Sequence, residues 1–92
     1  MRFKFSRQKS EGLRRNSSRG VGFEEIEALW TRPYYQDERN EDPAQFRAIG
    51  WVKGRLYTVI FEERTDAQGD FIHLVTLWKA TREERRLYEE HS

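Results

Sequence analysis

The chain has 92 residues, 36% hydrophobic and 14% aromatic, which is enough for one small domain with a thin core. It contains no cysteine, so disulfides, thiolate zinc sites and cysteine nucleophiles are excluded. Residues 1–20 carry seven Lys/Arg and one Glu, a net charge of +6, whereas the remainder carries ten Lys/Arg and fifteen Asp/Glu, a net charge of −5. The basic end is either a surface for a phosphate backbone or an acidic partner, or a solvated, mobile terminus.

The hydrophobic pattern of the sequence contains no membrane-spanning segment and no export signal. No segment approaches the roughly 18 apolar residues that a membrane span needs. The short apolar–basic stretch of residues 1–5 is not followed by the apolar region of a signal peptide. We therefore expect a cytoplasmic protein without a membrane partner.

The N-terminal third predicts one strand and two helices. Alternation over residues 2–5 predicts an edge strand with both phenylalanines facing the core. Ser6 is a helix-capping residue, so a short helix is expected from Arg7 to about Arg14, followed by a polar, basic loop. Apolar residues recur at helical spacing over residues 23–30, and Pro33 ends this second helix.

The middle of the chain predicts a hairpin. Residues 34–35 are a candidate short strand, and the acidic, polar stretch 36–43 is expected to be an exposed loop. Residues 44–52 and 55–62 are apolar and loosely alternating, and Lys53-Gly54 between them is typical of a tight hairpin turn. Two antiparallel strands are therefore expected here.

The C-terminal third predicts the central strand and the last helix. Residues 63–70 are expected to form a looser turn around Gly69. The apolar run 71–78 is typical of a largely buried strand. Thr81 and Glu84 have capping-box spacing, which predicts a helix over residues 82–90.

Together these elements give the order β-α-α-(β)-β-β-β-α. A small, mainly antiparallel sheet with two N-terminal helices and one C-terminal helix, all on one side, is an α+β fold. We expect one domain over residues 1–92, in which 1–20 form the basic strand, helix and loop, and 44–90 the sheet and last helix.

Titratable residues offer few sites. His73 lies in the central strand, on the face opposite Leu74, where a lone histidine is either a structural residue or a base. With two histidines and no cysteine, we expect no metal site and no cofactor. The chain has neither a nucleophile elbow nor a glycine-rich phosphate loop.

Basic residues cluster on the predicted hairpin sheet and last helix. Cleavage of RNA without a metal requires a base for the 2′-hydroxyl, cations for the charge on phosphorus, and an acid for the 5′-oxygen. Guanidinium groups suit the second task, although they equally form ion pairs along a solvated helix. We expect four of the cations, Arg64, Lys79, Arg82 and Arg85, to share one concave surface.

Several short strings occur in the order typical of one family. They are Gly20-Val21-Gly22-Phe23-Glu24-Glu25, Phe46-Arg47-Ala48-Ile49-Gly50, Gly54-Arg55-Leu56, Val59-Ile60-Phe61, Glu63-Arg64 and Lys79-Ala80-Thr81-x-x-Glu84-Arg85-x-x-Tyr88-Glu89. Over nearly the whole chain this pattern resembles the BrnT-type toxins, and its final string is the most specific part.

The resemblance implies a RelE-like fold and a metal-independent endoribonuclease, the toxin of a type II toxin–antitoxin pair. Its partners would be RNA and a small DNA-binding antitoxin, similar to ribbon-helix-helix proteins, with which it would form an oligomer. The candidate catalytic residues are Arg64, Lys79, Arg85 and His73. The candidate RNA-binding residues are Arg19, Arg47, Arg55, Arg82, Arg86 and Tyr88.

The chain departs from the family pattern at four positions. Ser18-Arg19 stands where the family has Lys-His, and His73 and Trp78 each stand where it has Arg. Arg19 could supply a cation and His73 a proton acceptor in their place. These departures keep a second hypothesis open, a catalytically degenerate module that binds antitoxin or RNA without cleaving it.

Overall fold

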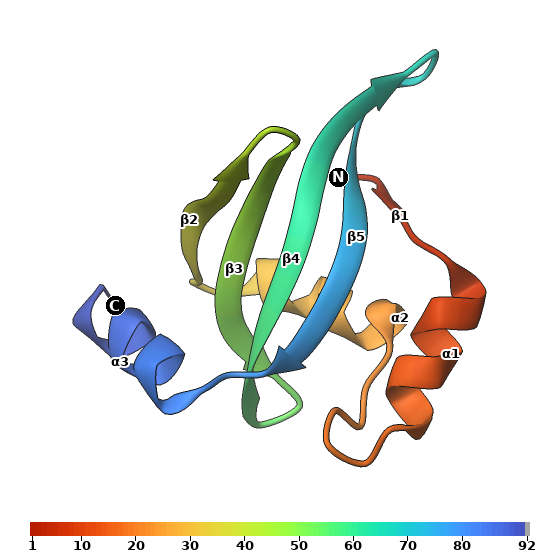
Figure 1. The fold of residues 1–92 in the computed structure, drawn as a ribbon. Helices are drawn as coiled ribbons and strands as arrows, with labels where there is room; N and C mark the ends of the chain where they lie inside the picture. Colours follow the sequence, from red (N-terminus) through yellow and green to blue (C-terminus); the bar gives the residue numbers. More distant parts are fainter. Residues whose placement is uncertain (92) are drawn as a thin grey trace.

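The computed structural model describes residues 1–91, which form a five-stranded sheet of order β1-β5-β4-β3-β2 with helices on both faces (Figure 1). Only the β1–β5 pair is parallel. The elements are β1 (Phe3–Lys4), α1 (Arg7–Arg15), α2 (Phe23–Ile26), the 3-10 helix η1 (Glu27–Thr31), β2 (Tyr35–Glu41), β3 (Ala44–Val52), β4 (Arg55–Asp66), β5 (Gly69–Lys79) and α3 (Arg82–Glu90).

The main core lies between the sheet and the N-terminal helices. Phe23, Ile26 and Leu29 are fully buried and pack against β3, β4 and β5, as their helical spacing predicts. In Figure 1, α2 and the segment that follows it cross behind the sheet. Gly50 allows this approach, because a Cβ there would lie 2.8 Å from Cγ of Leu29. We call this side the core face.

The basic N-terminus folds against the rest of the chain as β1 and α1. As predicted, Ser6 caps α1, its hydroxyl accepting a hydrogen bond from the Lys9 amide at 3.1 Å. Arg2 and Lys4 both pair with Asp66, at 2.8 and 2.5 Å. Arg14 pairs with three glutamates of α1 and α2, namely Glu11, Glu24 and Glu25. Much of the N-terminal positive charge is therefore neutralised within the chain.

The helix α3 packs on the opposite side of the sheet, which we call the α3 face (Figure 1). The predicted capping box is present, with Thr81 and Glu84 bonded to each other's amides at 3.1 and 2.9 Å. The expectation that all helices lie on one side is wrong. The odd-numbered residues of β3 are the reason, because Ile49 and Trp51 give this second face an apolar surface of its own.

Two further boundaries differ from the prediction. Residues 35–41 form the edge strand β2 instead of a loop, because Tyr35 and Asp37 alternate inward while charged residues face solvent. The β4–β5 turn is also tighter than expected, since β4 runs to Asp66 and β5 begins at Gly69, whose φ is +112°.

The observed order and layers confirm the α+β class with two N-terminal helices, a mostly antiparallel sheet and a C-terminal helix. Across residues 1–91, the helices are all too short or too polar to traverse a bilayer.

Candidate functional site

A buried carboxylate and a histidine meet on the α3 face. Glu62 of β4 and His73 of β5 are direct register partners, and the His73 Nδ1 lies 3.2 Å from Oε1 of Glu62. The Glu62 side chain is 10% exposed and that of His73 is 33% exposed. When Nδ1 carries the proton and donates it to this carboxylate, Nε2 is the nitrogen left to contact a ligand.

Two more side chains complete this group. Gln45 donates to Oε2 of Glu62 at 2.9 Å, and Arg64 donates to Oε1 through Nε at 2.9 Å and through a second, shorter contact from Nη2. The Gln45 hydrogen bond makes the largest contribution to lowering the pKa of Glu62, burial opposes it, and Arg64 and His73 lower it further. Glu62 is thus held ionised, able to orient His73. We call Gln45, Glu62, Arg64 and His73 the histidine cluster.

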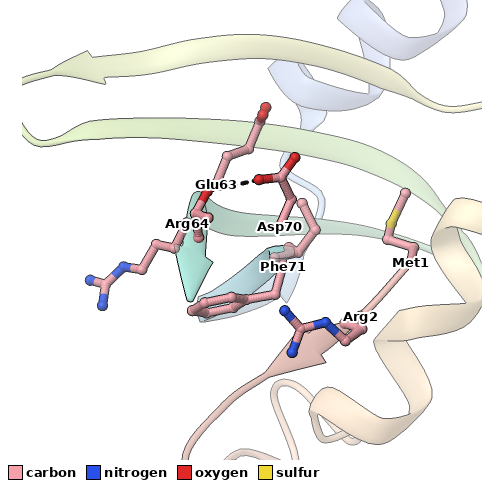
Figure 2. Close-up of a pocket in the computed structure, with 8 residues that line it drawn as sticks. Met1, Arg2, Glu63, Arg64, Asp70 and Phe71 are labelled. Carbon is pink, nitrogen blue, oxygen red and sulfur yellow. Dashed lines mark hydrogen bonds between the residues drawn. The ribbon is translucent and has the colours of Figure 1, made fainter. Parts of the chain in front are cut away.

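The histidine cluster lies beside the edge strand β1. Lys4 is the register partner of His73 across the parallel pair, and its Nζ lies 4.4 Å from the ring centroid of Phe71. Figure 2 shows the nearby end of the hairpin, where Arg64 and Phe71 project to one side and Glu63 to the other. The pocket drawn there has a volume of about 450 Å³. Arg64 lines this pocket, whereas His73 does not, and the Lys4 ammonium is paired with Asp66.

A β-bulge in β5 determines which side chains share the histidine's face. The pairing shifts between Ile60/Thr76 and Phe61/Leu74, so Val75 is the extra residue. Beyond the bulge, Leu77 returns to the core face with Leu74, and Trp78 joins His73 on the α3 face. Simple alternation would have grouped Leu77 with His73, which is wrong.

Four cations gather at the other end of the sheet. Lys53, Arg55, Lys79 and Arg85 line an open pocket of about 480 Å³ between the β3–β4 turn and the start of α3. We call these four residues the basic end. Within residues 1–91, none of them lies in ion-pair contact with a carboxylate. Like charges left together without counterions favour binding of an anion.

The structure therefore divides the predicted catalytic residues into two groups. Lys79 and Arg85 line the same pocket, whereas Arg64 belongs to the histidine cluster. Arg64 stands nine residues along β4 from Arg55, which is about 30 Å in an extended strand. The expectation of one surface shared by Arg64 and Arg85 is wrong, because β4 is longer than its apolar core indicates.

Two predicted RNA-binding residues are engaged inside the chain. Arg47 forms a two-point pair with Asp37 and lies 3.6 Å from Glu84, which fastens β3 to β2 and α3. Arg19 donates from Nε to the Leu77 carbonyl at 3.0 Å. Both guanidinium groups hold structure in this chain.

The other predicted RNA-binding residues lie on or near α3. Arg82 and Arg86 are exposed, and Arg55 belongs to the basic end. Tyr88 is half-buried, with its ring edge against Trp51 at 6.3 Å between centroids.

Three members of the two groups were not indicated by the sequence pattern, namely Glu62, Gln45 and Lys53. Glu62 could have been found from the register, because the tight turn between Asp66 and Gly69 places it opposite His73. Among residues 1–91, no three His, Asp or Glu side chains are grouped so as to hold a metal ion.

Comparison with models of protein families and with curated proteins finds no match to this chain.

Proposed function

We propose that the protein is a metal-independent endoribonuclease, the toxin of a type II toxin–antitoxin pair, acting in the cytoplasm and neutralised by a small DNA-binding antitoxin of ribbon-helix-helix type. The resemblance of its ordered strings to BrnT-type toxins motivates the family and a RelE-like fold. The observation that carries the activity is His73, fixed by the buried Glu62 and placed beside the guanidinium of Arg64. Proton transfer and charge neutralisation can therefore act on one phosphodiester.

The chemistry follows from the free atoms of the histidine cluster. The Nε2 of His73 accepts the proton of the RNA 2′-hydroxyl, and the 2′-oxygen attacks the adjacent phosphorus. Arg64 uses Nε and Nη2 on Glu62, so Nη1 remains to bind a phosphate oxygen as charge develops. The bond to the 5′-oxygen breaks, and the imidazolium or water protonates the leaving oxygen. A 2′,3′-cyclic phosphate and a 5′-hydroxyl result.

A second candidate is a binding module that retains antitoxin or RNA binding without cleavage. It is favoured by the basic end, whose four cations form an anion site that does not involve His73. It is also favoured by the pairing of Arg47 with Asp37 and Glu84, which uses one of the expected phosphate ligands inside the chain.

Cleavage by the purified chain distinguishes these two functions. We expect the protein to cut single-stranded RNA in excess EDTA, and His73→Ala to lower kcat by about a hundredfold to ten-thousandfold. Added imidazole should restore part of that loss, because the cavity left by the ring admits it. His91→Ala is the matched control, since His91 lies on the C-terminal end of α3 and should cleave normally.

Expression in cells provides the second arm of the experiment. The wild-type chain without an antitoxin should arrest growth, and His73→Ala should not. A folded wild-type protein that is harmless and cuts no RNA, with or without ribosomes, would leave the binding module as the function.

A further inference from the structure

The histidine cluster and the basic end are two separate places on the protein, the first on the α3 face and the second at the end of the sheet where the β3–β4 turn meets the start of α3. His73 and Lys79 stand six residues apart on β5, which is about 20 Å along the strand. Arg85 is brought to the basic end by α3, and Arg55 by the start of β4. The four cations of the basic end are therefore too far away to touch a phosphate that is in contact with Nε2 of His73.

The basic end has the composition of a phosphate site and lacks that of a catalytic one. Its lining contains Lys53, Arg55, Lys79 and Arg85 with Gly54, Leu56 and Ala80, and so offers no carboxylate, histidine or tyrosine for proton transfer. Guanidinium and ammonium groups bind phosphate oxygens through charge-assisted hydrogen bonds. Binding, without chemistry, is what these side chains can supply.

The surface between the two places also suits a nucleic acid. Trp78 lies on β5 between His73 and Lys79 and on the same face as His73, because of the Val75 bulge. Its indole is half-buried, and the exposed guanidinium of Arg39 lies 5.6 Å from the ring. An aromatic ring next to a cation is a typical contact for single-stranded nucleic acids.

We infer that the basic end is an anchoring subsite for the RNA backbone, remote from the cleavage point, and that the substrate is single-stranded RNA long enough to bridge the two. This inference rests on the proposed ribonuclease activity. At about 3.4 Å per stacked nucleotide, a 20 Å separation corresponds to roughly six nucleotides between the anchored phosphate and the scissile one. Short oligonucleotides would reach the histidine cluster without the anchor.

Binding to an uncleavable RNA tests the anchor independently of the chemistry. We would measure anisotropy of fluorescein-labelled 2′-O-methyl RNA, 12 or 3 nucleotides long, which lacks the attacking hydroxyl. For the 12-mer, the double variant Lys79→Gln/Arg85→Gln should weaken binding at least tenfold and reduce the slope of log K against log salt by about 1.4. For the 3-mer it should change binding less than twofold.

Matched variants control for charge and folding. Arg7→Gln/Lys9→Gln removes two exposed charges from α1 and should leave 12-mer binding within twofold of wild type. Lys79→Arg/Arg85→Lys keeps both charges and should restore the salt slope. A circular dichroism spectrum of Lys79→Gln/Arg85→Gln that matches the wild-type spectrum would exclude misfolding as the cause of its weaker binding.

Cleavage then shows where the anchor acts. On a 12-mer with natural riboses, Lys79→Gln/Arg85→Gln should raise KM about tenfold and leave kcat unchanged. On a trimer, both parameters should equal those of wild type. Unchanged 12-mer binding and salt slope in the Gln variant would overturn the anchoring subsite, as would an equal loss of kcat on both substrates. Wild-type protein that binds the 12-mer through Lys79 and Arg85 but cuts nothing would instead overturn the ribonuclease.

Discussion

The indole of Trp78 donates a hydrogen bond from Nε1 to the Glu84 carboxylate at 3.0 Å, joining the last strand to the last helix. Glu84 is 6% exposed and also accepts from the Thr81 amide at 2.9 Å. Arg47 lies 3.6 Å from its second oxygen. One carboxylate therefore caps α3, seats the helix against β5 and partly balances a half-buried guanidinium.

Replacing Glu84 by alanine should lower the free energy of unfolding by about 2–4 kcal/mol. The substitution leaves Trp78 Nε1 and the Arg47 guanidinium without this acceptor in a poorly solvated position. Chemical denaturation followed by far-ultraviolet circular dichroism measures the change.

Glu83→Ala is the control for Glu84→Ala. Glu83 is exposed in the same first turn of α3, so its loss should cost less than about 1 kcal/mol through the helix dipole alone. Equal destabilisation by both substitutions would show that the carboxylate acts only as a first-turn charge and that the Trp78 contact adds nothing.

Two glycines should respond oppositely to alanine. Gly50→Ala should destabilise the fold by about 1–3 kcal/mol, because the new methyl would lie 2.8 Å from Leu29 Cγ and 3.2 Å from Tyr34 Cβ. Gly12→Ala on α1 meets no atom within 4 Å and should stabilise by about 0.5–1 kcal/mol. Thermal unfolding of both variants measures these changes. A Gly50→Ala protein as stable as wild type would contradict the prediction.

Local patterns predicted most elements because their signals are contained within a few residues. Ser6 and the Thr81–Glu84 capping box predicted the starts of α1 and α3, and Lys53-Gly54 predicted the hairpin turn. The strand β2 was missed because an edge strand with one solvated side has few apolar residues to indicate it. Its inward residues are Tyr35 and Asp37, and Asp37 is recognisable only together with Arg47.

The candidate site was predicted less well because it depends on register. His73 and Arg64 were named from residue type, but Glu62 becomes their partner only through the pairing of β4 with β5. The Val75 bulge exchanges the faces of Leu77 and Trp78, and no residue in the sequence marks it. The structure accordingly places Arg64 in the histidine cluster but Lys79 and Arg85 at the basic end.

Acid should unfold the protein through carboxylates that are held ionised in the native state. Burial raises the pKa of Asp37, but hydrogen bonds from Arg47 and Tyr35 outweigh it and leave the pKa below the ordinary value of 3.8. Because the folded-state pKa is lowered, the contribution to stability is complete above about pH 4 and is lost as the pH falls through the folded-state value.

Asp37→Asn tests this pH dependence. The variant should be about 1–2 kcal/mol less stable near pH 7, because Arg47 loses a charged partner. Its free energy of unfolding should then fall less than that of wild type between about pH 5 and pH 2. Glu38→Gln, at an exposed neighbouring position on β2, should follow the wild-type curve. Parallel curves for Asp37→Asn and wild type would assign the acid sensitivity to other groups, such as Glu62.

Arg85 and Tyr88 contact the same indole and should nevertheless have different roles. The Arg85 guanidinium lies 5.6 Å from the Trp51 ring, and the Tyr88 ring meets Trp51 edge-on. Arg85 is exposed, so Arg85→Ala should cost at most about 1 kcal/mol of stability while weakening RNA binding. Tyr88 is half-buried, so Tyr88→Ala should cost about 1–3 kcal/mol.

Tyr88→Phe separates the ring from the hydroxyl. The hydroxyl donates to the Pro33 carbonyl at 3.4 Å, a long hydrogen bond at an exposed position, so its removal should change stability by less than about 0.5 kcal/mol. Denaturation and oligonucleotide binding should be measured on all three variants. We expect Tyr88→Ala to bind RNA normally at a temperature where it is folded, because its ring closes the contact between α3 and β3. A Tyr88→Ala protein with unchanged stability and weakened RNA binding would make the ring a base-stacking surface instead.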